Sequence, residues 1–205
     1  TTRTLTISED TFEARFIDGD TVVFSANLYD VYGNPTLGTQ SADTIVVDFL
    51  APSSGIVGSV LATGGDGSGD YWNAADTSLD VLVPIVNDDP TLVGGSSYLE
   101  ATLTGDNTAS FSAIGDTSTI IAGDLLASYL TISLTSTNLD GLIYSEGDIF
   151  YIRALVIDAA GNETVFSQSA TETVADTVKP YVASASSTED DGYFTIGDVI
   201  SFTYM

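Results

Sequence analysis

Two loops of the chain carry side chains that could ligate a hard cation. Residues 30–34 have the sequence DVYGN, and residues 158–162 have the sequence DAAGN. Carboxylate and amide oxygens are ligands that Ca²⁺ prefers, so Asp158 and Asn162 are candidate ligands of an ion. Turn geometry alone also explains the motif, because glycine permits a positive φ and asparagine tolerates it or closes a turn through its side chain. The sequence leaves both alternatives open.

The two loops belong to an internal repeat in which equivalent residues are 128 positions apart, as Asp30 and Asp158 are. Without a gap, the repeat also aligns Gly19-Asp20 with Gly147-Asp148, Gln40-Ser41-Ala42 with Gln168-Ser169-Ala170, Asp48 with Asp176, and Pro52 with Pro180. A match of this length indicates tandem modules. If the two prolines mark equivalent joints, one complete module covers residues 53–180. Residues 1–52 are then the last strands of a preceding module, and residues 181–205 are the opening strands of a following one.

The segments between these loops predict β-strands. In DIFYIRALVID, residues 148–158, alternation predicts a central strand whose buried face is formed by Phe150, Ile152, Ala154 and Val156. Arg153 then lies on the outer face. One short helical turn is expected near Asp124, but no segment has sustained helical periodicity. About seven short strands per module, separated by turns, are typical of an immunoglobulin-like β-sandwich. We therefore predict an all-β fold of tandem immunoglobulin-like β-sandwich modules.

Composition narrows the possible functions. The formal net charge is -25 with only four basic residues, which disfavours nucleic acid and membranes as partners, because anionic surfaces are bound through cationic side chains. The chain has no His and no Cys, and no carboxylate pair stands out among its 29 acidic residues. We therefore expect no enzymatic activity. The many Asp residues favour bound cations, although salt adaptation or the solubility of a long polymer would produce the same bias.

Two smaller motifs predict local structure, and the second also has a functional interpretation. NDDP, residues 87–90, predicts a turn after the strand SLDVLVPIV. Trp72 follows the glycine-rich stretch GGDGSGDY, and we expect it in the core. The alternative is that Trp72 and Tyr71 stack together on a carbohydrate.

Several of these runs resemble a known family. LDVLVPIVNDDPTLVGGSSYLEATL and EGDIFYIRALVIDAAGNETVFSQSATETVADTVKP are similar to the tandem immunoglobulin-like repeats of giant bacterial cell-surface adhesins, of the RTX-adhesin type and of gliding Bacteroidetes. STEDDGYFTIGDVISFT resembles the opening of a second repeat type that alternates with them. The resemblance covers most of residues 16–205. It implies an extracellular, cell-surface, non-catalytic module used for adhesion, biofilm formation or gliding, with neighbouring modules as partners and surface glycans bound outside this stretch.

In the adhesins that the chain resembles, calcium ions between modules make the chain of modules rigid. The matching residues here are Asp176 at the joint and the acidic residues of the loop after it. We expect Ca²⁺ after residue 176, held by Asp176 with one or more of Glu189, Asp190 and Asp191, and a second ion near Asp48 at the preceding joint. Crowded carboxylates would repel one another unless a divalent ion were shared among them. The sequence does not indicate which pole of the module carries the loop DAAGN.

The alternative function is a subunit of an S-layer or of a pilin-like fibre that assembles by strand exchange. In that case, neighbouring subunits of the same protein would donate strands to residues 1–52 and to residues 181–205.

Overall fold

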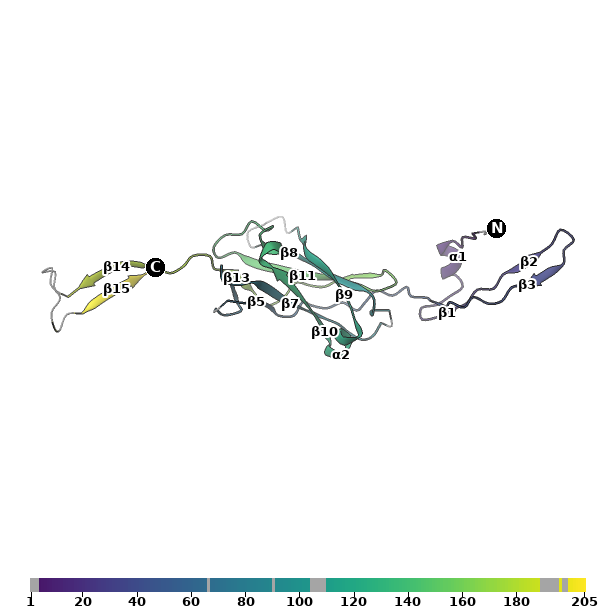
Figure 1. The fold of residues 1–205 in the computed structure, drawn as a ribbon, viewed down its shortest axis with the longest axis horizontal. Helices are drawn as coiled ribbons and strands as arrows, with labels where there is room; N and C mark the ends of the chain where they lie inside the picture. The colour runs from purple at the N-terminus through teal and green to yellow at the C-terminus, as the bar shows by residue number, and fades with distance from the viewer. Residues whose placement is uncertain (1–3, 66, 90, 104–109, 189–195, 197–198) are drawn as a thin grey trace.

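The structure is a computed structural model that describes residues 4–65, 67–89, 91–103, 110–188, 196 and 199–205. β-Strands predominate in this part of the chain, and its three α-helices contain only four to six residues each. The predicted all-β fold is confirmed. Figure 1 shows an N-terminal segment, a central region and a C-terminal hairpin.

The central region, residues 53–180, contains two β-sheets. Its elements are β5 (Val60–Thr63), β6 (Tyr71–Trp72), β7 (Ser78–Pro84), β8 (Ser96–Leu103), β9 (Ser112–Thr119), α2 (Ala122–Ala127), β10 (Tyr129–Thr135), α3 (Ser136–Leu139), β11 (Ile149–Ile157), β12 (Glu163–Val165) and β13 (Thr173–Ala175). The smaller sheet has the order β10-β7-β5, and the larger has the order β6-β13-β11-β8-β9 with β12 paired to β11. Neighbouring strands are antiparallel except β13 and β6, which are parallel.

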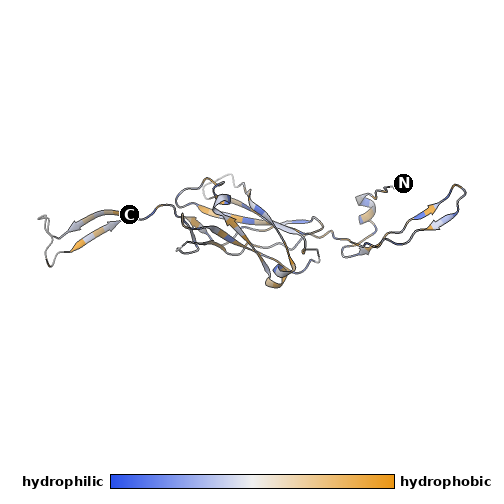
Figure 2. Ribbon diagram, viewed as in Figure 1, coloured by the Kyte–Doolittle hydropathy of each residue, from blue (hydrophilic) through white to orange (hydrophobic). Residues whose placement is uncertain are grey.

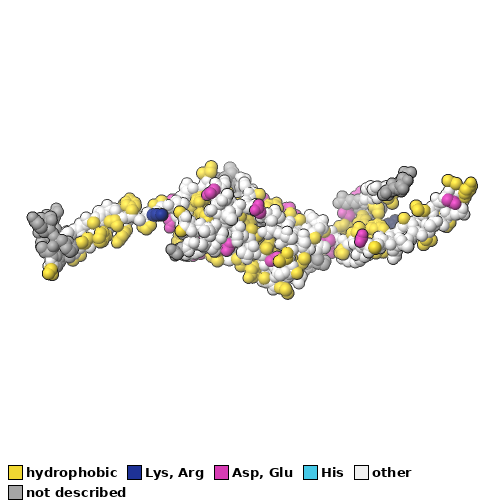
Figure 3. All heavy atoms as spheres, viewed as in Figure 1, with side chains coloured by type: hydrophobic (Ala, Val, Ile, Leu, Met, Phe, Trp, Pro, Cys, Tyr) yellow, Lys and Arg dark blue, Asp and Glu magenta, His cyan; other side chains and the backbone are white. Residues whose placement is uncertain are grey.

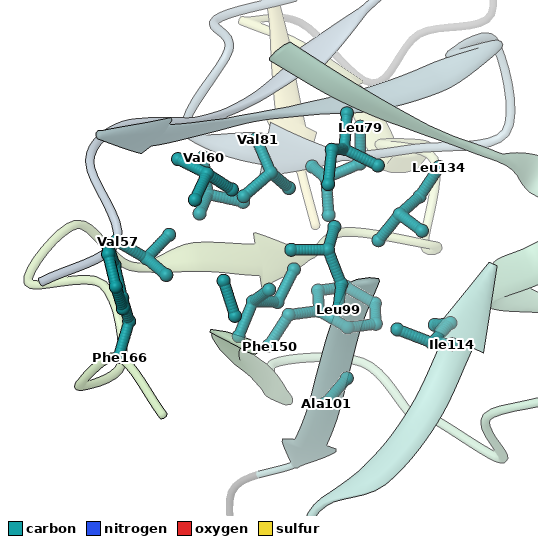
Figure 4. Packing of buried hydrophobic residues seen from close by; sticks show 14 of the residues in the cluster. Val57, Val60, Leu79, Val81, Leu99, Ala101, Ile114, Leu134, Phe150 and Phe166 are labelled. Atoms are coloured by element: carbon teal, nitrogen blue, oxygen red, sulfur yellow. The ribbon is translucent and has the colours of Figure 1, made fainter. Parts of the chain in front are cut away.

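One hydrophobic cluster lies between the two sheets, and all of its buried members lie between Val57 and Ala175 in the sequence. Figure 4 shows Leu79 and Leu134 of the smaller sheet across from Leu99 and Phe150 of the larger sheet. Alternation produces this arrangement, because every second residue of β7 is fully buried and the residues between them are partly exposed. Removal of this apolar surface from water is the main favourable contribution to folding.

Strand β11 has the predicted register. The four residues predicted to face the core are no more than 1% exposed, namely Phe150, Ile152, Ala154 and Val156. Arg153 lies on the outer face, where its guanidinium pairs with Glu100 at 2.6 Å and lies 4.3 Å from the ring centre of Phe111. Leu155 is also buried, although it belongs to the outer face. The strands on either side of β11, β8 and β12, place residues beside Leu155, and alternation within β11 does not predict these neighbours.

Two smaller expectations agree with the structure. Trp72 is buried in the core, and its indole N–H donates to the hydroxyl of Tyr144 at 3.0 Å. Since Tyr71 alone is exposed, the two aromatic residues do not form an open carbohydrate-stacking pair. The carboxylate of Asp124 accepts the backbone N–H of Ile121 at 2.8 Å at the start of α2.

The N-terminal segment repeats the strand pairing of the central region. Its elements are α1 (Glu9–Glu13), β1 (Thr21–Val22), β2 (Asn27–Tyr29), β3 (Pro35–Leu37) and β4 (Ile45–Val46). The corresponding pairs include Thr21–Val46 with Ile149–Val174, and Leu28–Thr36 with Val156–Thr164. β1 and β2 thus correspond to the two halves of β11. Leu28 is nevertheless 69% exposed, against 1% for Val156, because no sheet covers β2 among the described residues of this segment.

The C-terminal hairpin consists of β14 (Val182–Ser187) and the antiparallel β15 (Ile200–Tyr204). All residues of both strands are exposed, and Figure 2 shows hydrophobic residues among them in orange. Within the described ranges, no helix has the length and the hydropathy that are needed to cross a membrane.

Candidate metal centre between the N-terminal segment and the central region

The loop after β11 holds Asp158 in a fixed position. Its Oδ1 accepts the backbone N–H groups of Gly161 (2.7 Å) and Asn162 (2.9 Å), and its Oδ2 accepts the side-chain amide of Asn162 at 2.9 Å. Gly161 has a positive φ of 100°, which favours glycine at this position. Asp158 is only 3% exposed. The motif therefore closes a turn and presents a buried carboxylate at its base.

The first copy of the loop forms the same turn. Asp30 accepts the backbone N–H groups of Tyr32 and Asn34 at 2.9 Å and the side-chain amide of Asn34 at 2.8 Å. These hydrogen bonds, led by the one from the Asn34 side chain, hold the pKa of Asp30 below its ordinary value. The turn geometry that explains the motif is thus present in both copies, whereas the aspartate is buried only in the second copy.

Asp89, in the loop after β7, carries a carboxylate oxygen without a partner. Its Oδ1 accepts the backbone N–H of Thr91 at 2.7 Å and the hydroxyl of Thr91 at 2.9 Å. Its Oδ2 is buried, and no described residue donates a hydrogen bond to it. A buried polar atom without a partner costs about 1–3 kcal/mol, and more when it is charged. This oxygen therefore marks a place where a cation would be favourable.

A third carboxylate, that of Asp48, lies close to those of Asp89 and Asp158 and belongs to the N-terminal side of the joint between the two parts of the chain. Asp48 begins the first linker, residues 48–52, which joins the N-terminal segment to the central region. The single hydroxyl proton of Thr91 is shared between Oδ1 of Asp89 and Oδ2 of Asp48, while Oδ1 of Asp48 accepts the backbone N–H of Leu50 at 3.1 Å. One oxygen each of Asp48, Asp89 and Asp158 lies within 4.8 Å of the other two. We call these three residues the carboxylate cluster.

Further polar contacts tie the first linker to the loops of the central region. The side-chain amide of Asn162 lies 3.4 Å from the carbonyl oxygen of Asp48, and the hydroxyl of Thr164 donates to the carbonyl of Pro52 at 2.5 Å. Beside the cluster is a cavity of about 140 Å³, lined by Asp18, Asp48, Leu50, Ala51, Ser53, Asp88 and Asp89. Its lining again comes from both sides of the joint.

The electrostatics of the cluster favour a divalent ion. At a separation of 4.8 Å, two ionised carboxylates repel by ~0.9 kcal/mol in water and by ~3.5 kcal/mol at an effective dielectric constant of about 20. Among the residues that the structure describes, no Lys or Arg lines the adjoining cavity. Ca²⁺ takes about six to eight oxygen ligands in flexible geometry. The three carboxylates, one with an unpartnered buried oxygen, fit such an ion. Figure 3 shows further acidic side chains spread over the visible face.

The structure brings together three of the residues predicted as ligands, Asp48, Asp158 and Asn162. The loop DAAGN thus lies at the pole of the central region that meets the preceding segment. Asp89 was missed because NDDP predicts a turn, and this loop has no second copy in the chain that could mark it. Its buried, unpartnered oxygen is a property of the fold that no sequence pattern reveals.

Asp176 lies at the opposite pole of the central region, in the second linker, residues 176–180. It is exposed, its backbone N–H donates to the carbonyl of Trp72 at 2.8 Å, and among the described residues it belongs to no group of three acidic ligands. Glu189, Asp190 and Asp191 lie outside the described residues. The ion expected after residue 176 therefore stays a prediction.

No protein-family model matches this chain, and no curated protein matches it.

Proposed function

We propose that this chain is a non-catalytic structural part of an extracellular adhesin or surface filament, in which Ca²⁺ stiffens the joint between residues 1–52 and residues 53–180. The observation that carries the proposal is the carboxylate cluster. It takes Asp48 from one side of the joint and Asp89 and Asp158 from the other. An ion bound there would therefore connect two parts of the chain that are otherwise joined by a short linker.

The pairing order of the strands supports an immunoglobulin-like β-sandwich for residues 53–180. The order β5-β7-β10 corresponds to strands A, B and E of that fold, and β13-β11-β8-β9 corresponds to G, F, C and C′. Strand pairing in the N-terminal segment repeats the pairing of β11 with β12 and β13. This repetition supports tandem modules, with residues 1–52 ending one and residues 181–205 opening another.

The mechanical role follows from the balance of charges at the joint. Without an ion, repulsion among the three carboxylates opposes the contacts of Thr91, Asn162 and Thr164 with the first linker. With an ion, the repulsion becomes attraction. At about one hundred times its Kd, Ca²⁺ stabilises the closed joint by about 2.7 kcal/mol. Extracellular modules bind Ca²⁺ with Kd values of about 10⁻⁴–10⁻³ M, which suits a joint outside the cell.

The partners in this account are neighbouring modules of the same protein, and a stiff series of modules projects a distant binding region from the cell surface. Surface glycans would be bound by parts outside this stretch. Nucleic acid is not a partner, because the net charge of -25 would repel phosphates.

Exposed apolar strands favour a second candidate, a fibre or S-layer subunit assembled by strand exchange. Leu28 of β2 and Phe202 of β15 are 69% and 52% exposed, and strands of a neighbouring subunit would cover both. Light scattering of the chain over a wide concentration range separates the candidates. Strand exchange predicts concentration-dependent polymers, whereas modules within one chain predict a constant mass.

Isothermal titration calorimetry of the chain with Ca²⁺ tests the proposed joint. We expect saturable binding that weakens at least tenfold in Asp89→Asn. Asp116→Asn removes an exposed carboxylate of β9 and serves as the matched control, which should bind as the parent does. Absence of binding, or equal affinity of parent and Asp89→Asn, would contradict the proposal.

A further inference from the structure

The turns before β1 and β11 carry a second pair of equivalent acids, Asp18 and Glu146. Both turns have the pattern acid-Gly-Asp, at residues 18–20 and 146–148. In each turn the glycine has a φ of 82°. The Asp after it closes the turn, since the carboxylate of Asp148 accepts the backbone N–H of Ser145 at 2.6 Å and that of Asp20 accepts the N–H of Ile17 at 2.9 Å. The first acid is therefore not needed to form the turn.

That first acid binds the backbone of the chain that leaves the fold. A single oxygen of Glu146, Oε2, accepts the backbone N–H groups of Thr177 (2.6 Å) and Val178 (3.0 Å) and the hydroxyl of Thr177 (3.1 Å). In the N-terminal segment, Oδ1 of Asp18 accepts the backbone N–H of Phe49 at 2.8 Å. Phe49 and Thr177 are equivalent in the repeat. Each follows directly after the aspartate of its linker, Asp48 or Asp176.

We propose that Asp18 and Glu146 are positioning residues that anchor the outgoing linker and thereby set the direction in which the linker leaves its module. The anchor acts on the peptide unit beside Asp48 or Asp176, so it also orients the side chain that faces the next joint. It requires no metal ion, and it goes beyond the calcium-dependent function proposed above.

Little else holds the second linker at this point. Among the described residues, the hydrogen bonds of residues 177–180 all go to Glu146. The second linker also lines a groove of about 310 Å³ together with residues 73–75. Hydrogen bonds to a charged acceptor are roughly twice as strong as neutral ones. The carboxylate is therefore the main directional constraint on these residues.

Of the other Gly-Asp pairs in the chain, the one shortly before β15, at residues 197–198, has Ile196 in place of the acid. A Gly-Asp pair is thus not always preceded by an acid. In both copies that carry the acid, it faces the residue after a linker aspartate.

Protonation of Glu146 gives a direct observable. The N–H of Thr177, followed by its hydroxyl and the N–H of Val178, keeps the pKa of Glu146 below its usual value. The anchor is present above the ordinary pKa of glutamate, about 4.3, and is lost as the pH falls through the lowered value. Other charged groups near the contact are Asp148 in the same turn, and Asp176 and Lys179 in the second linker.

The test is a pH titration of backbone amides by ¹⁵N NMR in metal-free buffer. The amide protons of Thr177 and Val178 should titrate together, with one midpoint below about 4.3. Glu146→Gln should abolish this titration and lower the order parameters of residues 177–180. Glu146→Asp, which places at 146 the residue type found at 18, should retain the titration.

Glu172→Gln is the matched control, because Glu172 is exposed and lies four residues before Asp176. It should leave both amide titrations unchanged. Unchanged amide shifts of β11 in Glu146→Gln verify that the variant is folded. If Thr177 and Val178 titrate in Glu146→Gln as they do in the parent, or if neither titrates in the parent, the anchor is refuted. Because no Ca²⁺ is present, this result is independent of the proposed metal centre.

Discussion

Neutralising Asp89 should have opposite effects with and without calcium. Asp89→Asn keeps the shape of the side chain and removes one charge from the carboxylate cluster. In metal-free protein it removes two of the three repulsive pairs, each within 4.8 Å and each costing between ~0.9 and ~3.5 kcal/mol. The variant loses charge in the two hydrogen bonds from Thr91, which offsets part of this gain. We expect a net stabilisation of about 1–2 kcal/mol.

In saturating calcium we expect the parent to be more stable than Asp89→Asn. The parent gains about 2.7 kcal/mol when Ca²⁺ is at one hundred times the Kd of the parent. If the variant binds a hundredfold more weakly, the same concentration gives it only about 0.4 kcal/mol. The difference in stability then equals the calcium-binding free energy that the variant loses, minus the repulsion that the variant no longer has. Asp89→Asn is thus expected to be the more stable protein in chelator and the less stable one in Ca²⁺.

Differential scanning calorimetry in chelator and in Ca²⁺ measures both effects. For a unit of this size, 1 kcal/mol corresponds to a Tm change of roughly 3–5 °C, so both shifts are measurable. Asp116→Asn, which alters an exposed acid of β9, should follow the parent in both buffers. A variant that keeps the same rank relative to the parent in both conditions would refute the electrostatic reasoning.

Two further predictions test the fold. Val156→Ala should destabilise the central region by about 1.5–2.5 kcal/mol in urea unfolding, because Val156 is 1% exposed. Leu28 is its equivalent in the repeat and is 69% exposed, so Leu28→Ala should change stability by less than about 0.5 kcal/mol. Equal effects of the two substitutions would contradict the difference in burial. Trp72→Phe should cost about 1–3 kcal/mol, because it loses indole volume and leaves Tyr144 without its donor, while Tyr71→Phe at the neighbouring exposed position is the control. An unaffected Tm in Trp72→Phe would mean that the buried hydrogen bond contributes nothing.

Alternation and repetition predict much of the fold. The period of two residues predicts the inner face of β11, because side chains of a strand point alternately to its two faces. It does not predict the burial of Leu155, which depends on the flanking strands β8 and β12. A spacing of 128 residues likewise identifies equivalent turns. It does not show that only the second loop has a buried aspartate, Asp158, and a contact with a linker, through Asn162.

The candidate site was only partly predictable, because its residues are far apart in the sequence. Asp48, Asp158 and Asn162 were candidates from their types and their repeat positions. Asp89 was not, since it joins them only when β7 and β11 end at the same pole. The partners of Asp48 thus come from the loops after β7 and β11, which are far from it in the sequence. In the 128-residue repeat, Asp176 of the second linker is equivalent to Asp48 of the first linker.

Small-angle X-ray scattering of the chain with Ca²⁺ and with chelator tests the central claim most directly, because it measures the joint itself. In Ca²⁺ the scattering should fit one arrangement of the N-terminal segment on the central region, with a sharply defined maximum dimension. In chelator it should fit a broader distribution, and Asp89→Asn should change less than the parent between the two buffers. Superimposable curves for the parent in the two conditions would contradict a calcium-stiffened joint.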